Sequence, residues 1–189
     1  MKSNGNNADL VIEHTINGAS IQTHGAPFHG TIDSIMGNPN RFYPEQMPPI
    51  PNEPTRDRFN ISFIDNGVGE GVTSLVAFNP GDIVFGITGF FSSEVTLFSL
   101  QIAPGLHLHD PYFYGKLLHS CDPNTYVDLK TRSFIALKSI EPGEFVTLDY
   151  ARTEDYLFRT FPCGCGATNC RGYVAGRKQQ RKAAKAING

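Results

Sequence analysis

The chain has 189 residues, of which 40% are hydrophobic and 14 are phenylalanine, so it is long enough to bury one core without a covalent staple. Its formal net charge of −2 excludes the strong cationic field of proteins that are drawn to nucleic acid or to anionic membranes. No apolar run approaches the roughly 18 residues of a membrane span, and the first ten residues are too polar for a secretory signal. We therefore expect an intracellular protein, cytoplasmic or nuclear, with no membrane partner and no nucleic-acid partner.

Residues 1–58 are predicted to form an N-terminal segment that packs on the main domain. They contain a proline-rich stretch, residues 39–54, which holds six of the thirteen prolines. Because proline donates no backbone hydrogen bond, this stretch excludes a central strand. An ordered loop, serving as a lid or a partner surface, and a flexible linker are both compatible with the composition.

The rest of the chain is rich in short strand patterns. β-Branched and aromatic residues dominate seven segments, at residues 59–64, 72–78, 82–87, 95–102, 124–129, 133–140 and 144–150. Short helical turns are expected at 111–118 and 153–160. The pattern predicts a mainly β fold of several small sheets. The basic tail, residues 177–189, is expected to be a frayed helix or a solvated terminus.

A glycine-rich stretch, NGVGEGV at residues 66–72, resembles a phosphate-binding loop. It fails the dinucleotide-binding pattern because the third glycine would fall on Val72 and because a strand follows where that pattern needs a helix. A hairpin turn is the simpler interpretation. The glycines would still allow another group to approach the backbone closely.

Three of the four cysteines, Cys163, Cys165 and Cys170, fall within eight residues. A disulfide between the first two would be strained, whereas thiolates are good ligands for tetrahedral zinc. Three thiolates with an open position would suit a catalytic zinc, and a fourth would close the site. The remaining cysteine is Cys121, 42 residues before Cys163. Two disulfides in a secreted protein are the alternative.

A second group of candidate ligands is His107, His109 and Asp110. Strand residues two positions apart share a face, so the two histidines could bind one metal ion. Because no further ligand is near them in the sequence, a surface or site-lining role is the favoured interpretation.

Four motifs follow one another along the chain: GEGVTSLVAFNPGDIV at 69–84, LLHSCDPN at 117–124, EPGEFVTLDY at 141–150 and CGCGATNCRG at 163–172. In this order they resemble the signature motifs of the SET domain, the fold of most protein-lysine methyltransferases. The resemblance implies a SET domain over residues 59–160, with a knot-like crossing between the second and third motifs. It implies a post-SET zinc segment over residues 161–176. Residues 1–58 carry no signature of the family.

The resemblance also implies a partner for each thiol. In the family, the cysteine of the second motif and the three post-SET cysteines bind the same ion. One structural zinc per chain would therefore be held by Cys121, Cys163, Cys165 and Cys170. A closed four-thiolate site folds the C-terminal segment and does not activate water.

The cofactor implied by the resemblance is S-adenosylmethionine. The positions that would bind it are Gly69, Glu70, Gly71, Leu118, His119, Tyr150 and Val174. Tyr150 would stand at the reacting centre, where its hydroxyl can orient the methyl group and the incoming amine. Asp149 could be a base, but neighbouring strand residues face opposite ways, so structural contacts are its expected role.

Three positions depart from the family pattern. Leu118 replaces an asparagine, Ile87 stands where tyrosine is frequent, and Leu148 occupies the position associated with product multiplicity. Ile87 and Leu148 are assigned to the substrate channel, which these residues make more apolar. Such a channel is compatible with higher methylation states, with another nucleophile, or with a lost activity.

The resemblance implies an S-adenosylmethionine-dependent methyltransferase whose substrate is a lysine amine of a protein or peptide. One alternative is an enzyme of the same fold that methylates a small molecule or uses the cofactor for another reaction. The other is a non-catalytic module that binds a protein. Cofactor binding separates this module from both enzymes. The sequence does not indicate an oligomeric state.

Overall fold

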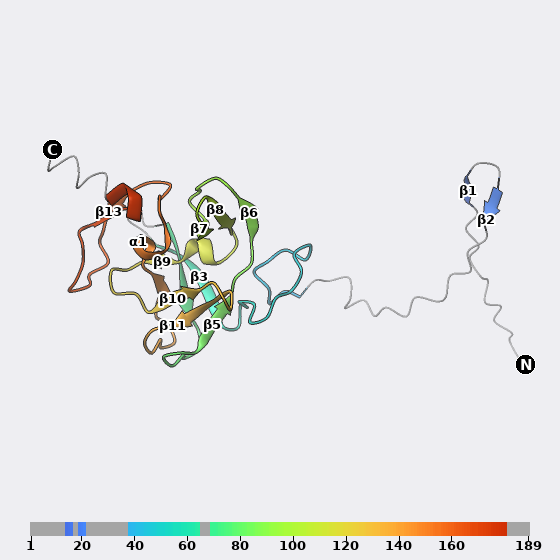
Figure 1. Cartoon of the computed structure of the whole chain (residues 1–189). Coiled ribbons are helices and arrows are strands. Elements are labelled where there is room, and N and C mark those ends of the chain that lie inside the picture. The colour runs from blue at the N-terminus through green and yellow to red at the C-terminus, as the bar shows by residue number, and fades with distance from the viewer. Residues whose placement is uncertain (1–13, 17–18, 22–37, 65–68, 181–189) are drawn as a thin grey trace, which may run out of the picture. The chain divides into compact units, whose positions relative to one another are not determined.

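The structure, a computed structural model, describes residues 14–16, 19–21, 38–64 and 69–180 (Figure 1). Its Cα positions divide the chain into two units, Met1–Gly37 and Asn38–Gly189. In the first unit, β1 (His14–Ile16) and β2 (Ala19–Ile21) form an antiparallel hairpin. The second unit carries the four motifs. Most of the N-terminal segment, residues 65–68 around the start of the glycine-rich stretch and residues 181–189 of the basic tail lie outside the described residues.

The described part of the second unit consists of short strands, two short helical elements and a helical stretch at residues 177–180. The strands are β3 (Phe59–Ile64), β4 (Gly69–Ser74), β5 (Ile83–Gly86), β6 (Phe90–Ser92), β7 (Ser99–Ala103), β8 (Leu106–His109), β9 (Leu118–His119), β10 (Thr125–Asp128), β11 (Ser133–Ala136), β12 (Thr147–Leu148), β13 (Phe161–Pro162) and β14 (Tyr173–Val174). The helical elements are the 3-10 turn η2 (Tyr114–Lys116) and the helix α1 (Tyr150–Thr153).

These strands form small, mostly antiparallel sheets. Two sheets have three strands, in the orders β10–β11–β5 and β6–β8–β7. The pairs β3–β4 and β13–β14 are antiparallel, whereas β9 and β12 pair in parallel. The predicted mainly β fold of several small sheets is therefore confirmed.

Aromatic rings fill the centre of the second unit. Phe59, Phe85, Phe113 and Phe134 are fully buried, and their neighbouring ring centroids lie 4.5–5.7 Å apart. Several of these pairs meet edge to face, the arrangement that the ring quadrupole favours. The rings belong to β3, β5, β11 and the segment before η2, so one cluster joins a hairpin to a three-stranded sheet.

The proline-rich stretch is an ordered loop that packs on this core. Tyr43 and Met47 are buried, and the Tyr43 hydroxyl donates a hydrogen bond to Asp110 Oδ2 at 2.9 Å. An ion pair between Arg41 and Glu53, with Arg41 Nη2 3.0 Å from Glu53 Oε2, joins the two ends of the loop. The described residues of this stretch thus form a loop that packs on the core, and its role as a lid or a partner surface stays a prediction.

The Asp110 carboxylate also explains why His107, His109 and Asp110 form no metal site within the described residues. Asp110 is fully buried and accepts hydrogen bonds from Tyr43 and from three backbone amides that follow it. His109 Nδ1 lies 2.8 Å from the Thr96 hydroxyl oxygen. Asp110 thus fixes the turn before η2, and the histidines do not converge with it on a common point.

The prediction of a helical turn at 153–160 is wrong. α1 ends at Thr153, and the described residues 154–160 contain no helix. The backbone N–H of Gln101 donates to the Glu154 carboxylate at 3.1 Å, and the Asp155 N–H donates to Gln101 Oε1 at 2.7 Å. These contacts with β7, far away in the sequence, override the local helical preference. No described helix is long and apolar enough to span a membrane.

Candidate active site

The second and third motifs meet in the parallel pair β9–β12. Leu118 lies opposite Thr147 and His119 opposite Leu148. The side chain of Asn124 secures this crossing, because its Oδ1 accepts from Thr147 N at 2.8 Å. β12 leads directly into α1, so its pairing with β9 sets where the first residue of that helix lies.

Tyr150 is the first residue of α1. Its hydroxyl donates a hydrogen bond to the carbonyl oxygen of Leu117. Its ring centroid lies 5.2 Å from that of His119 and 6.4 Å from that of Phe161. Burial raises the pKa of the Tyr150 hydroxyl well above its usual value, and the nearby charge of Glu154 raises it further. The hydroxyl therefore stays protonated near neutral pH, where it can orient a partner but cannot act as a base.

Asp149 caps α1 and ties the C-terminal segment to it. Its side chain is 3% exposed and accepts a hydrogen bond from Ala151 N at 3.1 Å. The Arg171 guanidinium binds both carboxylate oxygens, at 2.5 Å and 3.1 Å. Asp149 therefore makes the structural contacts expected of it. Sequence reasoning missed Arg171, although its place directly after the last clustered cysteine was a usable signal.

His119 fills the space between this ion pair and Tyr150. Its side chain is 2% exposed, and its Nδ1 accepts a hydrogen bond from Tyr150 N at 3.3 Å. Burial lowers the pKa of His119; the Asp149 charge opposes this shift and Arg171 adds to it. The imidazole is therefore neutral near pH 7 and is held by the backbone of Tyr150.

The glycine motif forms the first half of β4 and lies against the second motif. Gly69 has φ +92°, and a Cβ added there would meet no atom of the described residues within 4 Å, so among these residues its backbone faces open space. Gly71 is tightly enclosed: an added Cβ would stand 3.2 Å from Leu118 Cδ1 and closer still to two other side chains. Glu70 forms an ion pair with Lys116. Of the three motif residues, Gly69 is thus the one that leaves room for a ligand.

The four cysteines gather at one point. Their sulfur atoms all lie within 4.8 Å of one another, and the Sγ atoms of Cys121 and Cys163 are 3.8 Å apart. All four are free thiols, so the two-disulfide alternative does not describe this structure. Zinc bound tetrahedrally at about 2.3 Å separates its sulfurs by about 3.8 Å. The cluster therefore has the composition and the spacing of a closed four-thiolate zinc site.

The surroundings of these thiols bear on their ionisation. Backbone amides of Cys121 and Ala167 lower the pKa of Cys165 to about 6, whereas burial raises the pKa of Cys163 to about 12. Four thiolates this close together repel one another unless a cation balances their charge. The donor set fits a bound metal ion better than four separate thiols.

Three further residues from the sequence prediction lie in the interior. Ile87 and Leu148 are both 6% exposed and belong to the main core. Val174 is fully buried and pairs with Phe161, whose ring reaches Tyr150. Val174 thus links the C-terminal segment to the candidate reacting centre, and the channel role of Ile87 and Leu148 stays a prediction.

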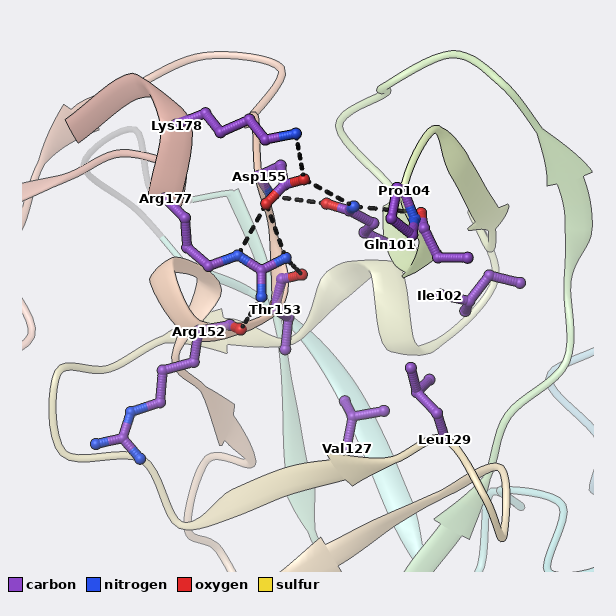
Figure 2. Close-up of a pocket in the computed structure, with 11 residues that line it drawn as sticks. Gln101, Ile102, Pro104, Val127, Leu129, Arg152, Thr153, Asp155, Arg177 and Lys178 are labelled. Atoms are coloured by element: carbon purple, nitrogen blue, oxygen red, sulfur yellow. Dashed lines mark hydrogen bonds and ion pairs between the residues drawn. The ribbon is translucent and has the colours of Figure 1, made fainter. Parts of the chain in front are cut away.

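A pocket of about 590 Å³ opens beside α1 (Figure 2). Arg152 and Thr153, at the end of α1, line it together with residues of β7, of β10 and of the segment after β14. The lining does not include Gly69 or Tyr150. Since Tyr150 begins the same four-residue helix, the pocket is a neighbour of the candidate reacting centre.

Comparison with known proteins finds partial similarity to methyltransferases, although no family model matches the chain. A histone-lysine N-methyltransferase, H3 lysine-36 specific, from Aspergillus oryzae is 40% identical over 76 residues, which cover 37% of this chain and 8% of that protein. One from Gibberella zeae is 27% identical over 173 residues, which cover 87% and 16%. Methyltransferase flvH from Aspergillus flavus is 31% identical over 106 residues, which cover 54% and 60%. The chain spans about 8% of the length of the Aspergillus oryzae protein.

A solved structure extends this similarity to the fold. The crystal structure of KRYPTONITE in complex with mCHG DNA and SAH aligns with a TM-score of 0.50 and 24% identity, over 61% of this chain and 29% of that one. The four motifs predict several small sheets, a crossing between the second and third motifs and a cluster of cysteines. The described residues have small sheets, a parallel pair β9–β12 and four cysteines at one point. The chain has the mainly β SET fold.

Proposed function

We propose that the chain is an S-adenosylmethionine-dependent methyltransferase that acts on a lysine amine of a protein. The observation that carries the proposal is the setting of Tyr150, whose protonated hydroxyl is fixed to the Leu117 carbonyl where the second and third motifs cross. The similarity to proteins named histone-lysine N-methyltransferase supports the same reaction class. The fold shared with a protein solved in complex with SAH agrees with it.

The proposed cofactor site lies along the glycine motif and the second motif. S-Adenosylmethionine supplies, when bound, a methyl group on a sulfonium ion. Gly69 fits such a ligand because its backbone faces open space in a conformation that favours glycine. The neutral, buried His119 would support the site, and Leu118 would offer apolar contact. The residues proposed to hold the cofactor are Gly69, Glu70, Gly71, Leu118, His119, Tyr150 and Val174.

The proposed chemistry depends on orientation and on exclusion of water. A lysine amine attacks only when neutral, and its pKa in water is about 10.4. The rings of Tyr150, His119 and Phe161 lie close to one another, and an apolar setting of this kind would lower the pKa of an amine placed beside them. Tyr150 would hold the amine in line with the methyl group. We assign no base, because Tyr150 stays protonated and Asp149 binds Arg171.

The proposal includes one structural zinc held by Cys121, Cys163, Cys165 and Cys170. Four thiolates leave no open position, so the ion would not bind substrate or water. It would instead fix the C-terminal segment, which brings Arg171 to Asp149 and Phe161 to Tyr150. We therefore assign the zinc a folding role that the reacting centre depends on.

Methyl transfer to a panel of lysine peptides, measured by mass spectrometry, tests the function. Tyr150→Phe should lower turnover by about 10²-fold, because the orienting hydroxyl is lost while the ring remains. Cofactor affinity should stay within about a few-fold of the original. Tyr126→Phe, at a 43% exposed tyrosine in β10, is the matched control and should behave like the parent protein. Unchanged turnover in Tyr150→Phe would refute the role of that hydroxyl.

Methyl transfer to a small molecule is a second candidate. Leu118 favours it, because leucine offers the cofactor no hydrogen bond and packs directly against Gly71. The match to flvH, a protein named only as a methyltransferase, covers 60% of that protein, whereas the match to the Aspergillus oryzae histone methyltransferase covers 8% of that one. Small amines assayed beside the peptides separate the two candidates. A protein that binds no S-adenosylmethionine would instead be an interaction module.

A further inference from the structure

One wall of the pocket beside α1 is apolar. Ile102 and Pro104 form part of it at the end of β7 and in the turn that follows. Val127 and Leu129 complete it from β10 and the residue after that strand. Figure 2 shows these side chains across the pocket from its arginine and lysine residues. Apolar surface that lines a pocket is where an apolar group of a ligand gains most from leaving water.

The opposite wall carries an excess of positive charge. It contains Arg152, Arg177 and Lys178, whose side chains are 80%, 46% and 51% exposed. Asp155 is the single carboxylate among the lining residues. Its oxygens are already occupied, by Arg177 Nε at 3.0 Å, Lys178 Nζ at 2.9 Å and Gln101 Nε2 at 3.2 Å. The lining thus carries three cations and one carboxylate, and both oxygens of that carboxylate are already paired within the protein.

Two of the three cations keep donors for an added anion. Arg177 is held in place, since its guanidinium also donates to the backbone oxygens of Arg152 and Thr153 at 3.1 Å and 3.2 Å. The Lys178 ammonium has three N–H groups, of which Asp155 accepts one. The Arg152 guanidinium is largely solvent-exposed, with its Nε 3.4 Å from an Asp149 oxygen. A carboxylate entering the pocket would therefore meet the Lys178 ammonium, while the exposed Arg152 guanidinium, which Figure 2 shows turned away from Lys178, would add its charge only from the rim.

The pocket adjoins the helix that begins with Tyr150, since Thr153 at the other end of that helix lines it. Tyr150 and Thr153 are three residues apart, which corresponds to about 4.5 Å along the helix axis. An extended peptide covers that distance in about two residues, at about 3.3 Å each. We infer that this pocket binds the substrate residues adjacent to the target lysine and selects an acidic side chain beside an apolar one. The inference rests on the proposed function, which places the target lysine at Tyr150.

The charge of the pocket sets this substrate apart from a lysine- and arginine-rich histone tail. A basic residue in the pocket would stand beside Arg152 and Lys178 with no carboxylate available to pair with it. Repulsion between like charges at a binding surface weakens the binding of a basic residue there, and attraction between opposite charges strengthens the binding of an acidic one. A segment with one acidic and one apolar side chain could pair with the positive charges and bury its apolar group against the apolar wall at the same time.

Fluorescence polarisation of two labelled peptides tests the inference on the full chain. Both peptides have a central lysine and an adjacent leucine, and they differ by glutamate or lysine two positions from the centre. Each exposed ion pair changes affinity by a small factor, so attraction in one peptide and repulsion in the other should together favour the acidic peptide by about tenfold at low salt. Added salt should reduce the preference. Arg152→Glu should abolish or reverse it.

Arg159→Glu is the matched control, because Arg159 is exposed and does not line the pocket. It should keep the preference for the acidic peptide. Equal loss of preference in both variants would overturn the inference, because net charge alone would then explain the selection. A duplex oligonucleotide runs in a parallel arm. If it binds in place of the acidic peptide and Arg152→Glu prevents this, nucleic acid occupies the pocket and the inference is wrong.

Methyl transfer from S-adenosylmethionine, measured on the same samples, separates this inference from the proposed function. Selection of the acidic peptide without any methyl transfer would support the pocket assignment and refute the function. Methyl transfer with equal binding of the two peptides would refute the pocket assignment and leave the function standing. Thermal unfolding of each variant verifies that a changed preference comes from a folded protein.

Discussion

Replacing Arg171 with methionine should destabilise the second unit well beyond the C-terminal segment. The change removes two hydrogen bonds, of 2.5 Å and 3.1 Å, from the Asp149 carboxylate, whose side chain is 3% exposed. Loss of one partner from a buried ion pair costs about 3–5 kcal/mol, because the other charge stays buried. Arg171 is itself 36% exposed and Arg152 remains nearby, so we expect about 2–3 kcal/mol. For a domain of this size, Tm should fall by about 4–12 °C.

A double-mutant cycle isolates this ion pair. Thermal unfolding is compared for the parent protein, Arg171→Met, Asp149→Asn and the double variant, all with excess zinc. Asparagine still caps α1 through Ala151 N but carries no charge, so the double variant should recover most of the stability that Arg171→Met loses. Zinc content is measured in every variant, so that metal loss is recognised. If the two single losses add to within about 0.5 kcal/mol, the coupling between these side chains is refuted.

Three further predictions concern the metal, the pH and the cofactor. Elemental analysis should find one zinc per chain, and Cys121→Ser should release it; a Cys121–Cys170 disulfide in metal-free protein would contradict the site. Burial raises the pKa of Glu154 from 4.5 to about 7, so the folded chain holds a proton that the unfolded chain releases. Stability measured by urea unfolding should therefore fall as the pH rises from about 4.5 to about 7, and Glu154→Gln should remove this slope; an unchanged slope would mean another group causes it. Leu118→Asn should tighten cofactor binding about tenfold in calorimetry if the site is an ordinary methyltransferase site, whereas weaker binding with lost turnover would favour the small-molecule candidate.

Strand positions followed from the sequence for some segments only: residues 144–150 were predicted as one strand, yet β12 is Thr147–Leu148 and Tyr150 begins α1. Residues 59–64, rich in aromatic and branched side chains, were predicted as a strand and form β3. The prediction for the next strand began at Val72, three residues after the true start of β4 at Gly69. Glycine has no side chain to signal a strand, yet Gly69 and Gly71 pair with Ile64 and Ser62 across the hairpin.

The site was predictable to the extent that its parts are motifs. The spacing of the cysteines pointed to a thiolate cluster, and the structure brings all four sulfurs together. The ion pair of Asp149 and Arg171 was not foreseen, because its partners lie 22 residues apart and only the place of Arg171 directly after Cys170 indicated that it would lie near the crossing. The helix wrongly expected at 153–160 failed for a similar reason, since Gln101 binds Glu154 and Asp155 from a distant strand.

The cysteine cluster also has a consequence for the order in which a newly synthesised chain becomes competent. Cys121 and Cys163 are 42 residues apart, and closing a loop of that length costs about 3–4 kcal/mol in chain entropy. Translation proceeds from the N-terminus, so β9 and Tyr150 leave the ribosome before the three later cysteines. Until those cysteines dock, Asp149 lacks Arg171 and the Tyr150 ring lacks Phe161. The reacting centre is therefore completed late in synthesis, when the C-terminal segment closes onto a domain that has already formed.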